Sequence, residues 1–281
     1  MNVERMASNI QSASSRIHVL EVVGNAIVGG MENSVARLIE RLPPQRFSLS
    51  VLCPFESPFT DELRGLGAEV YITAMPEDPA WSSIQFACAL IKANCVDILH
   101  SHLANAHLLA GVAGRLAGKP VLATIHGRQL TSMDLEVHRT ANTHLHVVCK
   151  QSYFHALGIG VNPAQLHFIA NGVDTDVFKP QRKTAGPLRQ RFGIPDDAKV
   201  VGFVGRLSAE KGPDVFLRTA LGVRETSPRT RFLVVGEGPM QKQLHSFIQQ
   251  FDLAPTVHLV GMQTDMPAVM AEIDVLVSAS H

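Results

Sequence analysis

Short apolar segments alternate with amphipathic helical segments along nearly the whole chain. The first such unit is an expected strand over 17–23 (IHVLEVV), a glycine-containing loop over 24–30 and a helix over 31–42. In that helix, apolar residues recur at helical spacing from Val35 to Leu42, which gives one face to bury. A strand, a glycine loop and a helix in this order are typical of the start of a doubly wound α/β domain.

The same alternation continues to the end of the chain. Further strands are expected over 47–52, 68–72, 96–99, 120–125, 145–149, 166–169, 200–204, 231–235, 257–259 and 273–277. Further helices are expected over 60–66, 82–93, 104–117, 151–157, 188–192, 214–225, 240–251 and 266–272. Strands that alternate with helices form parallel sheets, because parallel neighbours need a crossover connection. The pattern therefore predicts an α/β protein built from doubly wound parallel sheets.

Composition narrows the classes of function. Apolar residues make up 46% of the 281 residues and charged residues 18%, so we expect a large core rather than disorder. The formal net charge is zero, which argues against a nucleic-acid partner bound through an overall basic surface. The four cysteines are scattered without zinc-ligand spacing, which favours free thiols in a reducing compartment.

The amino-terminal segment is polar and lacks the apolar core of a secretory signal. No uninterrupted apolar run approaches the length that spans a bilayer. We therefore expect a cytoplasmic protein.

The stretch 200–212 (VVGFVGRLSAEKG) predicts a diphosphate-binding loop. An apolar strand ends at Gly205, Arg206 and Lys211 follow within one loop, and Pro213 opens a helix. Two cations and the positive end of a helix thus gather at the carboxyl end of a buried strand. The same residue types also occur at solvated helix starts that bind nothing, so the loop by itself leaves both interpretations open.

The residues GRLSAEKG at 205–212 resemble the nucleotide-sugar signature of glycosyltransferase family 4. Segments at 29–38 (GGMENSVARL), 124–127 (TIHG) and 170–178 (ANGVDTDVF) fit the same resemblance. It implies a GT-B fold, with two Rossmann-like domains facing a cleft. The implied reaction transfers a sugar, from a UDP-sugar by expectation, to an acceptor hydroxyl with retention of the anomeric configuration.

The resemblance also implies roles for single residues. Arg206 and Lys211 would stabilise the departing diphosphate, and His126 would contact the donor sugar at the reaction centre. The implied donor- or substrate-binding residues are Gly29, Gly30, His102, Asn171, Gly172, Gly205, Glu237, Gly261 and Met262. The Gly29–Gly30 pair would also allow close approach of a ligand and φ values that other residues resist.

Three histidines follow the strand expected over 96–99. His100 and His102 would share one face of an extended segment, so two metal ligands are geometrically feasible. No carboxylate or cysteine follows at ligand spacing, and we expect no metal and no other cofactor. His107 is expected to pack on the helix over 104–117.

A polar segment around Pro180 is the best candidate for a domain boundary. We expect a flexible tail over 1–15, an acceptor-side domain over 16–180, a linker over 181–197 and a partial nucleotide-sugar domain over 198–281. The last domain is expected to be partial because the resemblance places two further glutamates, separated by seven residues, after His281. On that ground we expect a fragment with weak or no turnover.

The expected partners are a nucleotide-sugar and a saccharide or lipid-linked acceptor, without nucleic acid. A lipid-linked acceptor would bring peripheral contact with the inner membrane face. Two other functions fit the same residues: a nucleotide-sugar epimerase or hydrolase of the same fold, and a non-catalytic nucleotide-binding fragment.

Overall fold

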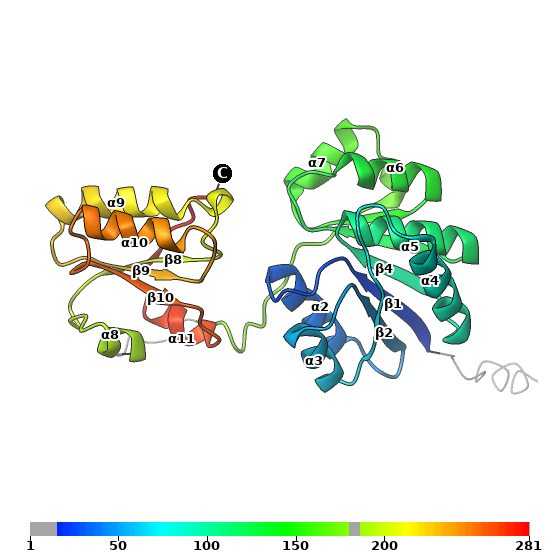
Figure 1. Ribbon diagram of the computed structural model, residues 1–281, viewed down its shortest axis with the longest axis horizontal. Coiled ribbons are helices and arrows are strands. Elements are labelled where there is room, and N and C mark those ends of the chain that lie inside the picture. The colour runs from blue at the N-terminus through cyan, green and yellow to red at the C-terminus, as the bar shows by residue number, and fades with distance from the viewer. Residues whose placement is uncertain (1–15, 180–185, 281) are drawn as a thin grey trace, which may run out of the picture. The chain divides into compact units, whose positions relative to one another are not determined.

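The computed structural model describes residues 16–179 and 186–280, and the chain divides into two compact units between Gly172 and Val173. The tail predicted over 1–15 and residues 180–185 of the predicted boundary lie outside the described residues. Each unit is a parallel sheet with helices on both faces (Figure 1).

The first unit carries seven strands among its described residues. Its elements are β1 (Ile17–Val23), α2 (Gly30–Arg41), β2 (Phe47–Cys53), α3 (Pro58–Gly65), β3 (Glu69–Ile72), α4 (Trp81–Ala93), β4 (Ile98–His102), α5 (Ala104–Ala117), β5 (Val121–Ile125), α6 (Ser132–Ala141), β6 (His144–Val147), α7 (Lys150–Gly158), the 3₁₀-helix η1 (Pro163–Gln165) and β7 (Leu166–Phe168). All neighbouring strands are parallel, in the order β3-β2-β1-β4-β5-β6-β7. The doubly wound sheet predicted from the alternating pattern is confirmed.

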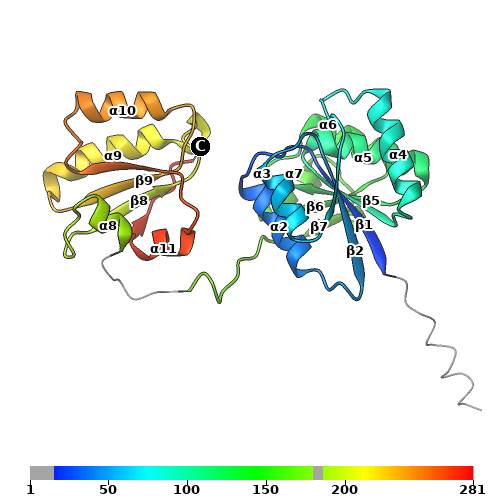
Figure 2. The ribbon, with the colours of Figure 1, turned by 60° about the horizontal axis from the view of Figure 1, so that its bottom comes forward.

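Helices cover both faces of this sheet (Figures 1 and 2). On one face, Val35 of α2 and Phe59 of α3 pack in a core with strands β1 and β2. On the other face, Leu109 of α5 packs with Leu20 and Leu99 of the sheet. A sheet with both faces buried needs strands that are apolar throughout, and this is what the short apolar runs in the sequence reflect.

The second unit is a smaller sheet of the same kind. Its elements are α8 (Pro187–Arg191), β8 (Val200–Val204), the 3₁₀-helix η2 (Ala209–Lys211), α9 (Pro213–Thr226), β9 (Arg231–Val235), α10 (Gln241–Gln250), β10 (Val257–Gly261), α11 (Met266–Ala271) and β11 (Val275–Leu276). The strands are parallel in the order β10-β9-β8-β11. Figure 1 shows α9 and α10 on one face of the sheet and α8 and α11 on the other.

Aromatic rings fill the core beneath α9. Phe216 lies between Phe203 and Phe232, with ring centroids 5.7 and 5.9 Å apart, in tilted and edge-on arrangements that favour aromatic pairs. The opposite face buries Leu188 of α8 and Val269 of α11.

The segment predicted as a linker over 181–197 contains α8, which belongs to the second unit. The carboxylate of Glu272 accepts hydrogen bonds from the backbone amides of Leu188 and Arg189 at 3.1 and 2.8 Å. A carboxylate at the first turn of a helix satisfies amides that have no partner within the helix. From Gly186 on, the predicted linker is therefore part of a packed domain.

Two local predictions differ from the structure. Helix α6 was not expected, although Thr131 and Asp134 form a capping box, with the Thr131 hydroxyl accepting from the Asp134 amide at 3.1 Å. The strand expected over 96–99 instead runs from Ile98 to His102. His100 and His102 therefore lie within the sheet rather than in the loop after it.

Candidate functional site

In parallel α/β sheets, ligands bind beyond the carboxyl ends of the strands where the strand order reverses. In the first unit that reversal lies between β1 and β4, and in the second between β8 and β11. Most of the residues predicted to bind substrate follow the carboxyl ends of strands, so each unit carries its own cluster.

In the second unit, three loops come together after β8, β9 and β10. The Gly205 amide donates to the Val235 carbonyl at 3.0 Å, and the Leu207 amide donates to the Glu237 carbonyl at 2.9 Å. The Gly236 amide donates to the Gly261 carbonyl at 3.0 Å. The structure thus brings together Gly205, Glu237 and Gly261, which the sequence placed up to 56 positions apart.

Close packing of these loops requires glycine at two positions. A Cβ atom on Gly238 would lie 2.5–2.8 Å from the backbone of Leu207, and one on Gly236 would meet the carbonyl of Gly205. Gly236 also has a φ of +129°, in a region that other residues avoid. The glycines of the G-x-G turn after β9 therefore allow its backbone to pack against the backbone of the loop after β8.

Arg206 and Lys211 both have exposed side chains on this loop cluster. Among the described residues neither side chain forms a hydrogen bond or an ion pair. Lys211 ends η2, and Gly212, at φ +65°, turns the chain into α9. The prediction that a helix begins at Pro213 beside two cations is confirmed. The Glu210 carboxylate of the same loop is the nearby anion, since the charges of Arg206 and Lys211 contribute to lowering its pKa.

Glu237 and Met262 also lie at the surface of this cluster, and Met262 has 63% of its surface exposed. Gly261 has a φ of +81°, and a carboxylate oxygen of Glu237 lies 3.7 Å from where a Cβ would stand.

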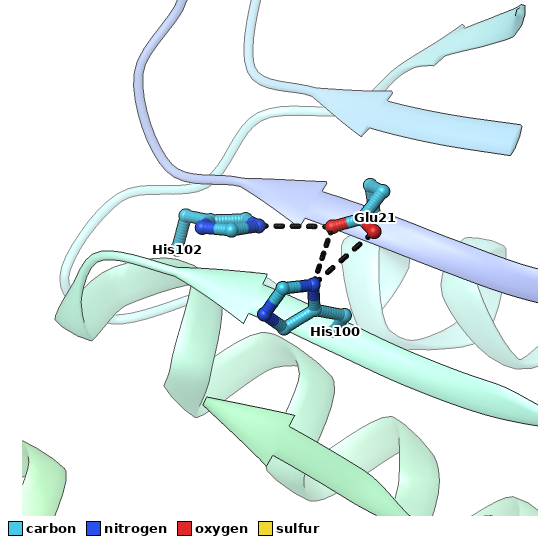
Figure 3. Close-up of side chains that lie close together, drawn as sticks. All are labelled: Glu21, His100 and His102. Carbon is cyan, nitrogen blue, oxygen red and sulfur yellow. Dashed lines mark hydrogen bonds and ion pairs between the residues drawn. The ribbon is translucent and has the colours of Figure 1, made fainter. Parts of the chain in front are cut away.

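In the first unit, a buried carboxylate joins the two histidines of β4 (Figure 3). Glu21 of β1 lies opposite His100 in the strand register. One of its carboxylate oxygens, Oε2, lies 2.9 Å from Nδ1 of His100 and 2.9 Å from Nε2 of His102. Glu21 has no exposed surface, and its position inside an otherwise apolar strand gives no local sign of a functional role.

The histidines decide the charge of this carboxylate. Burial acts to raise the pKa of Glu21, but the charge of His100 and hydrogen bonds from His100 and His102 outweigh burial and lower the pKa to about 2. Burial and the charge of His100 lower the pKa of His102. Glu21 is therefore ionised and His102 neutral at physiological pH.

Two hydrogen-bonded branches leave this centre. Nδ1 of His102 lies 2.9 Å from Nε2 of His126, the residue that follows β5. Nε2 of His100 lies 2.7 Å from the Thr124 hydroxyl, which lies 2.8 Å from Nδ1 of His146. The second branch ends at the Ile169 carbonyl, 3.0 Å from Nε2 of His146.

His126 is half-buried at the carboxyl end of β5. Burial, followed by the charges of His102, His100 and His146, lowers its pKa to about 3. A neutral imidazole at this position can exchange hydrogen bonds with a sugar hydroxyl, the role predicted for it.

His102 was predicted to contact substrate, and the structure gives it another place. Its side chain is buried and both of its ring nitrogens already have partners, Glu21 and His126. It can act on a substrate only through His126. His107, predicted to pack on its helix, is buried in α5 and bonded to Asp134 and Thr143 at 3.0 and 2.9 Å.

Glu21, His100 and His102 are the described residues whose grouping could suit a metal ion, because their ligand-type atoms lie within 4.8 Å of one another. No carboxylate follows these histidines at ligand spacing in the sequence, and the carboxylate that joins them, Glu21, comes from a neighbouring strand. The 2.9 Å separations are those of hydrogen bonds, so these potential ligand atoms already bind one another directly.

Gly29 and Gly30 lie where β1 passes into α2. Gly29 has a φ of −160°, which any residue adopts, and Gly30 is the first residue of the helix. The expectation of unusual φ values at this pair was wrong. No protein atom lies within 4 Å of a Cβ built on Gly30, so this helix start is open.

The end of β4 holds a strained backbone. Leu103 has a φ of +78°, which is rare for a residue with a branched side chain. The flanking carbonyl of His102 accepts from the Gly24 amide at 3.0 Å, and the Leu103 carbonyl accepts from the His107 amide at 2.9 Å. Such strain is typical of functional sites, where surrounding bonds hold it in place.

Asn171 and Gly172 are exposed at the end of the first unit. No protein atom lies within 4 Å of a Cβ built on Gly172. Beyond them, the Asp174 carboxylate accepts from the Asp176 amide at 2.9 Å and stabilises the turn. The structure leaves the predicted role of Asn171 and Gly172 in substrate binding as a prediction.

Comparison with known families places the chain. Residues 28–177 match Glycosyltransferase Family 4. The chain belongs to glycosyltransferase family 4. Residues 186–281 match a second family, Glycosyl transferases group 1. Both units of this glycosyltransferase are thus covered by family matches.

Relatives of this glycosyltransferase act on different acceptors. UDP-Gal:alpha-D-GlcNAc-diphosphoundecaprenol alpha-1,3-galactosyltransferase of Escherichia coli is 25% identical over 96% of the chain and 75% of its own length. The 2-deoxystreptamine glucosyltransferase of Streptomyces kanamyceticus is 30% identical over 66% of the chain and 54% of its own length.

Solved structures show the same fold. Anabaena Alr3699/HepE in complex with UDP-glucose has a TM-score of 0.81 at 18% identity, over 94% of this chain and 74% of that one. A putative UDP-N-acetylglucosamine 2-epimerase from Listeria monocytogenes has a TM-score of 0.62 at 13% identity, over 93% and 74%. The predicted GT-B fold, with two Rossmann-like domains, is confirmed, and a protein described as a putative epimerase has it as well.

Within residues 16–179 and 186–280, no helix combines the length and the apolar character needed to cross a bilayer.

Proposed function

We propose that this glycosyltransferase transfers a sugar from a UDP-sugar to an acceptor hydroxyl. The observation that carries the proposal is the loop cluster of the second unit, where the side chains of Arg206 and Lys211 are both exposed and, among the described residues, form no hydrogen bond or ion pair. A diphosphate would pair with both cations and accept hydrogen bonds from the start of α9. The HepE complex with UDP-glucose supports UDP as the nucleotide.

The chemistry follows from where charge develops. When the bond between sugar and diphosphate breaks, negative charge grows on the leaving phosphate, and the two cations stabilise it. Removing one such preorganised group typically costs about 10²–10³ in rate. Because these cations can do the work of a divalent ion, transfer would need no metal. Membership of the family supports retention of the anomeric configuration.

The acceptor is a saccharide or a lipid-linked saccharide. The Escherichia coli relative is named for an acceptor linked to diphosphoundecaprenol. An acceptor of that class would place this protein in the cytoplasm with peripheral contact at the inner membrane face. His126 of the first unit would exchange a hydrogen bond with a sugar hydroxyl during transfer.

Arg206→Ala tests the donor site. We expect UDP affinity, measured by isothermal titration calorimetry, to fall at least about tenfold, because a charge-assisted hydrogen bond contributes about 1.5–3 kcal/mol. Transfer of labelled sugar from the UDP-sugar to a lipid-linked saccharide, assayed in the presence of EDTA, should fall with it.

Arg229→Ala is the matched control, because Arg229 is an exposed arginine at the opposite end of β9, where it pairs with the exposed Asp197 at 3.3 Å. Equal UDP affinity for Arg206→Ala and Arg229→Ala would remove the donor-site assignment. Conversion of the labelled UDP-sugar to an epimer without acceptor would favour an epimerase instead. UDP binding without any turnover would favour a non-catalytic nucleotide-binding protein.

A further inference from the structure

In the histidine network of the first unit, the contact with the Ile169 carbonyl determines which atom donates each hydrogen bond. The Ile169 carbonyl can only accept a hydrogen bond, so Nε2 of His146 carries a proton. Burial lowers the pKa of His146, which is therefore neutral, and its Nδ1 accepts from the Thr124 hydroxyl. The Thr124 oxygen must then accept from Nε2 of His100.

This requirement makes His100 a cation. Its Nε2 proton is directed to Thr124, while its Nδ1 faces the ionised carboxylate of Glu21, which only accepts. Both ring nitrogens therefore carry protons, and His100 and Glu21 form an ion pair in the middle of the sheet. A buried ion pair is costly to desolvate, so its presence here calls for a reason other than stability.

The contact between His102 and Glu21 determines which atoms donate hydrogen bonds in the branch that leads to His126. Nε2 of His102 donates to Glu21 Oε2 at 2.9 Å. His102 is neutral, so its Nδ1 has a lone pair and accepts from Nε2 of His126 at 2.9 Å. His126 is neutral too, which leaves its Nδ1 as a lone pair. In the described part of the chain this Nδ1 makes no hydrogen bond.

We propose that Glu21 is a positioning residue which, through His102, holds His126 as the Nε2–H tautomer and leaves Nδ1 to accept a hydrogen bond from a sugar hydroxyl. This inference rests on the proposed function for its ligand, but not for the tautomer itself. Nδ1 of His126 is then a hydrogen-bond acceptor. A hydroxyl group can donate a hydrogen bond to it, whereas an ether or phosphate oxygen cannot. The ion pair with His100 keeps Glu21 charged. Glu21 therefore always accepts from His102, and His102 in turn accepts from Nε2 of His126.

The tautomer can be read directly in the unaltered protein. Long-range ¹H–¹⁵N correlation spectra at pH 7, with histidine labelled and the His126 signals assigned by their loss in His126→Asn, should show an unprotonated Nδ1 and a protonated Nε2. An Nδ1–H tautomer or an imidazolium at His126 would overturn the proposal. This measurement does not depend on transfer, so it separates the proposal from the proposed function.

Glu21→Gln tests the cause. An amide can donate as well as accept, so we expect the protonation of His126 to become mixed between the two nitrogens. Transfer should fall in kcat by about 10–100-fold, by analogy with the loss of a carboxylate that orients a metal-bound histidine. The KM for the UDP-sugar should stay near the wild-type value, because the cations proposed to bind its diphosphate lie in the second unit. Glu21→Asp should recover part of both losses.

Glu62→Gln, on the exposed surface of α3, is the matched control and should leave tautomer and rate unchanged. If Glu21→Gln fails to fold, the spectra of the wild-type protein and of Glu21→Asp decide the question. Zn²⁺ retained in equal amount to the purified wild-type protein and lost in Glu21→Asp would show a metal centre in place of the hydrogen-bonded network, and would overturn the proposal.

Discussion

At the scale of single residues, the first unit buries charged side chains inside its sheet, where apolar side chains normally lie. Glu21 and His100 lie opposite each other in adjacent strands and are nearly inaccessible to water. Only pairing and further hydrogen bonds make this tolerable, and every polar atom of the pair described above has a partner. Such satisfied networks orient side chains more rigidly than apolar packing does.

This arrangement predicts that acid destabilises the protein. The pKa of His126 falls from 6.5 to about 3 on folding, and that of Glu21 falls from 4.5 to about 2. In both windows the unfolded chain binds more protons than the folded one, so stability decreases as pH falls below 6.5 and again below 4.5. For the fully buried Glu21 the loss amounts to about 3 kcal/mol, at about 1.4 kcal/mol per pKa unit.

Urea unfolding followed by circular dichroism between pH 7 and pH 4 checks this prediction. The midpoint of the wild-type protein should move to lower urea as the pH falls. In His126→Asn the movement between pH 6.5 and pH 4.5 should be smaller. Parallel curves for the two proteins would contradict the lowered pKa of His126.

At the scale of elements, loops rather than helices define the candidate donor site. The segments after β8, β9 and β10 are tied by backbone hydrogen bonds, so the exposed Arg206 side chain is carried on a rigid base. Rigid support matters because a binding group that must first be ordered loses affinity to that ordering.

Gly238→Ala tests this support. Its Cβ would lie 2.5–2.8 Å from the Leu207 backbone, so one of the two loops must shift. We expect a loss of about 1–3 kcal/mol in stability, the usual cost of overpacking, together with weaker UDP binding by calorimetry.

Gly222→Ala is the control for Gly238→Ala. Gly222 lies within α9, and no protein atom is within 4 Å of where its Cβ would stand. Alanine there should stabilise the protein by about 0.5–1 kcal/mol without changing UDP affinity. If Gly238→Ala behaves in the same way as Gly222→Ala, the loops do not need their close approach.

At the scale of the whole molecule, two cores are built from separate stretches of chain. The residues of each hydrophobic cluster come from one unit only. A ligand of one unit should therefore first stabilise that unit, since binding stabilises whatever it contacts in the folded state.

Hydrogen–deuterium exchange with UDP alone checks this expectation. UDP at about 100 times its Kd should add about 2.7 kcal/mol to the stability of the state that binds it. Protection should appear in the loops after β8, β9 and β10, while amides of β1 and β4 exchange as they do without ligand. Protection confined to the first unit would place the nucleotide site there instead.

The sequence by itself determined the succession of most strands and helices along the chain, the division into two α/β domains and the cation-bearing loop at 205–212. These features are local: apolar runs, glycine loops and helix starts are each encoded within a few neighbouring residues. The position of His126 at a strand end was predicted for the same reason. Helix α6 was missed although its capping signal is also local, because the residues around it lack a clear apolar stripe.

Only the tertiary structure decided which residues surround His126. Glu21 meets His100 and His102 across 79 and 81 positions of sequence because β4 lies beside β1, whereas β2 and β3, which come between them in the sequence, lie on the other side of β1. Alternation along a strand tells which face a residue takes, but nothing local tells which strand will lie next to it. Crossover connections and the packing of the whole sheet decide which strands become neighbours. As a result, Glu21 of the largely apolar strand β1 and His102, which was predicted to contact substrate, form a carboxylate–histidine network.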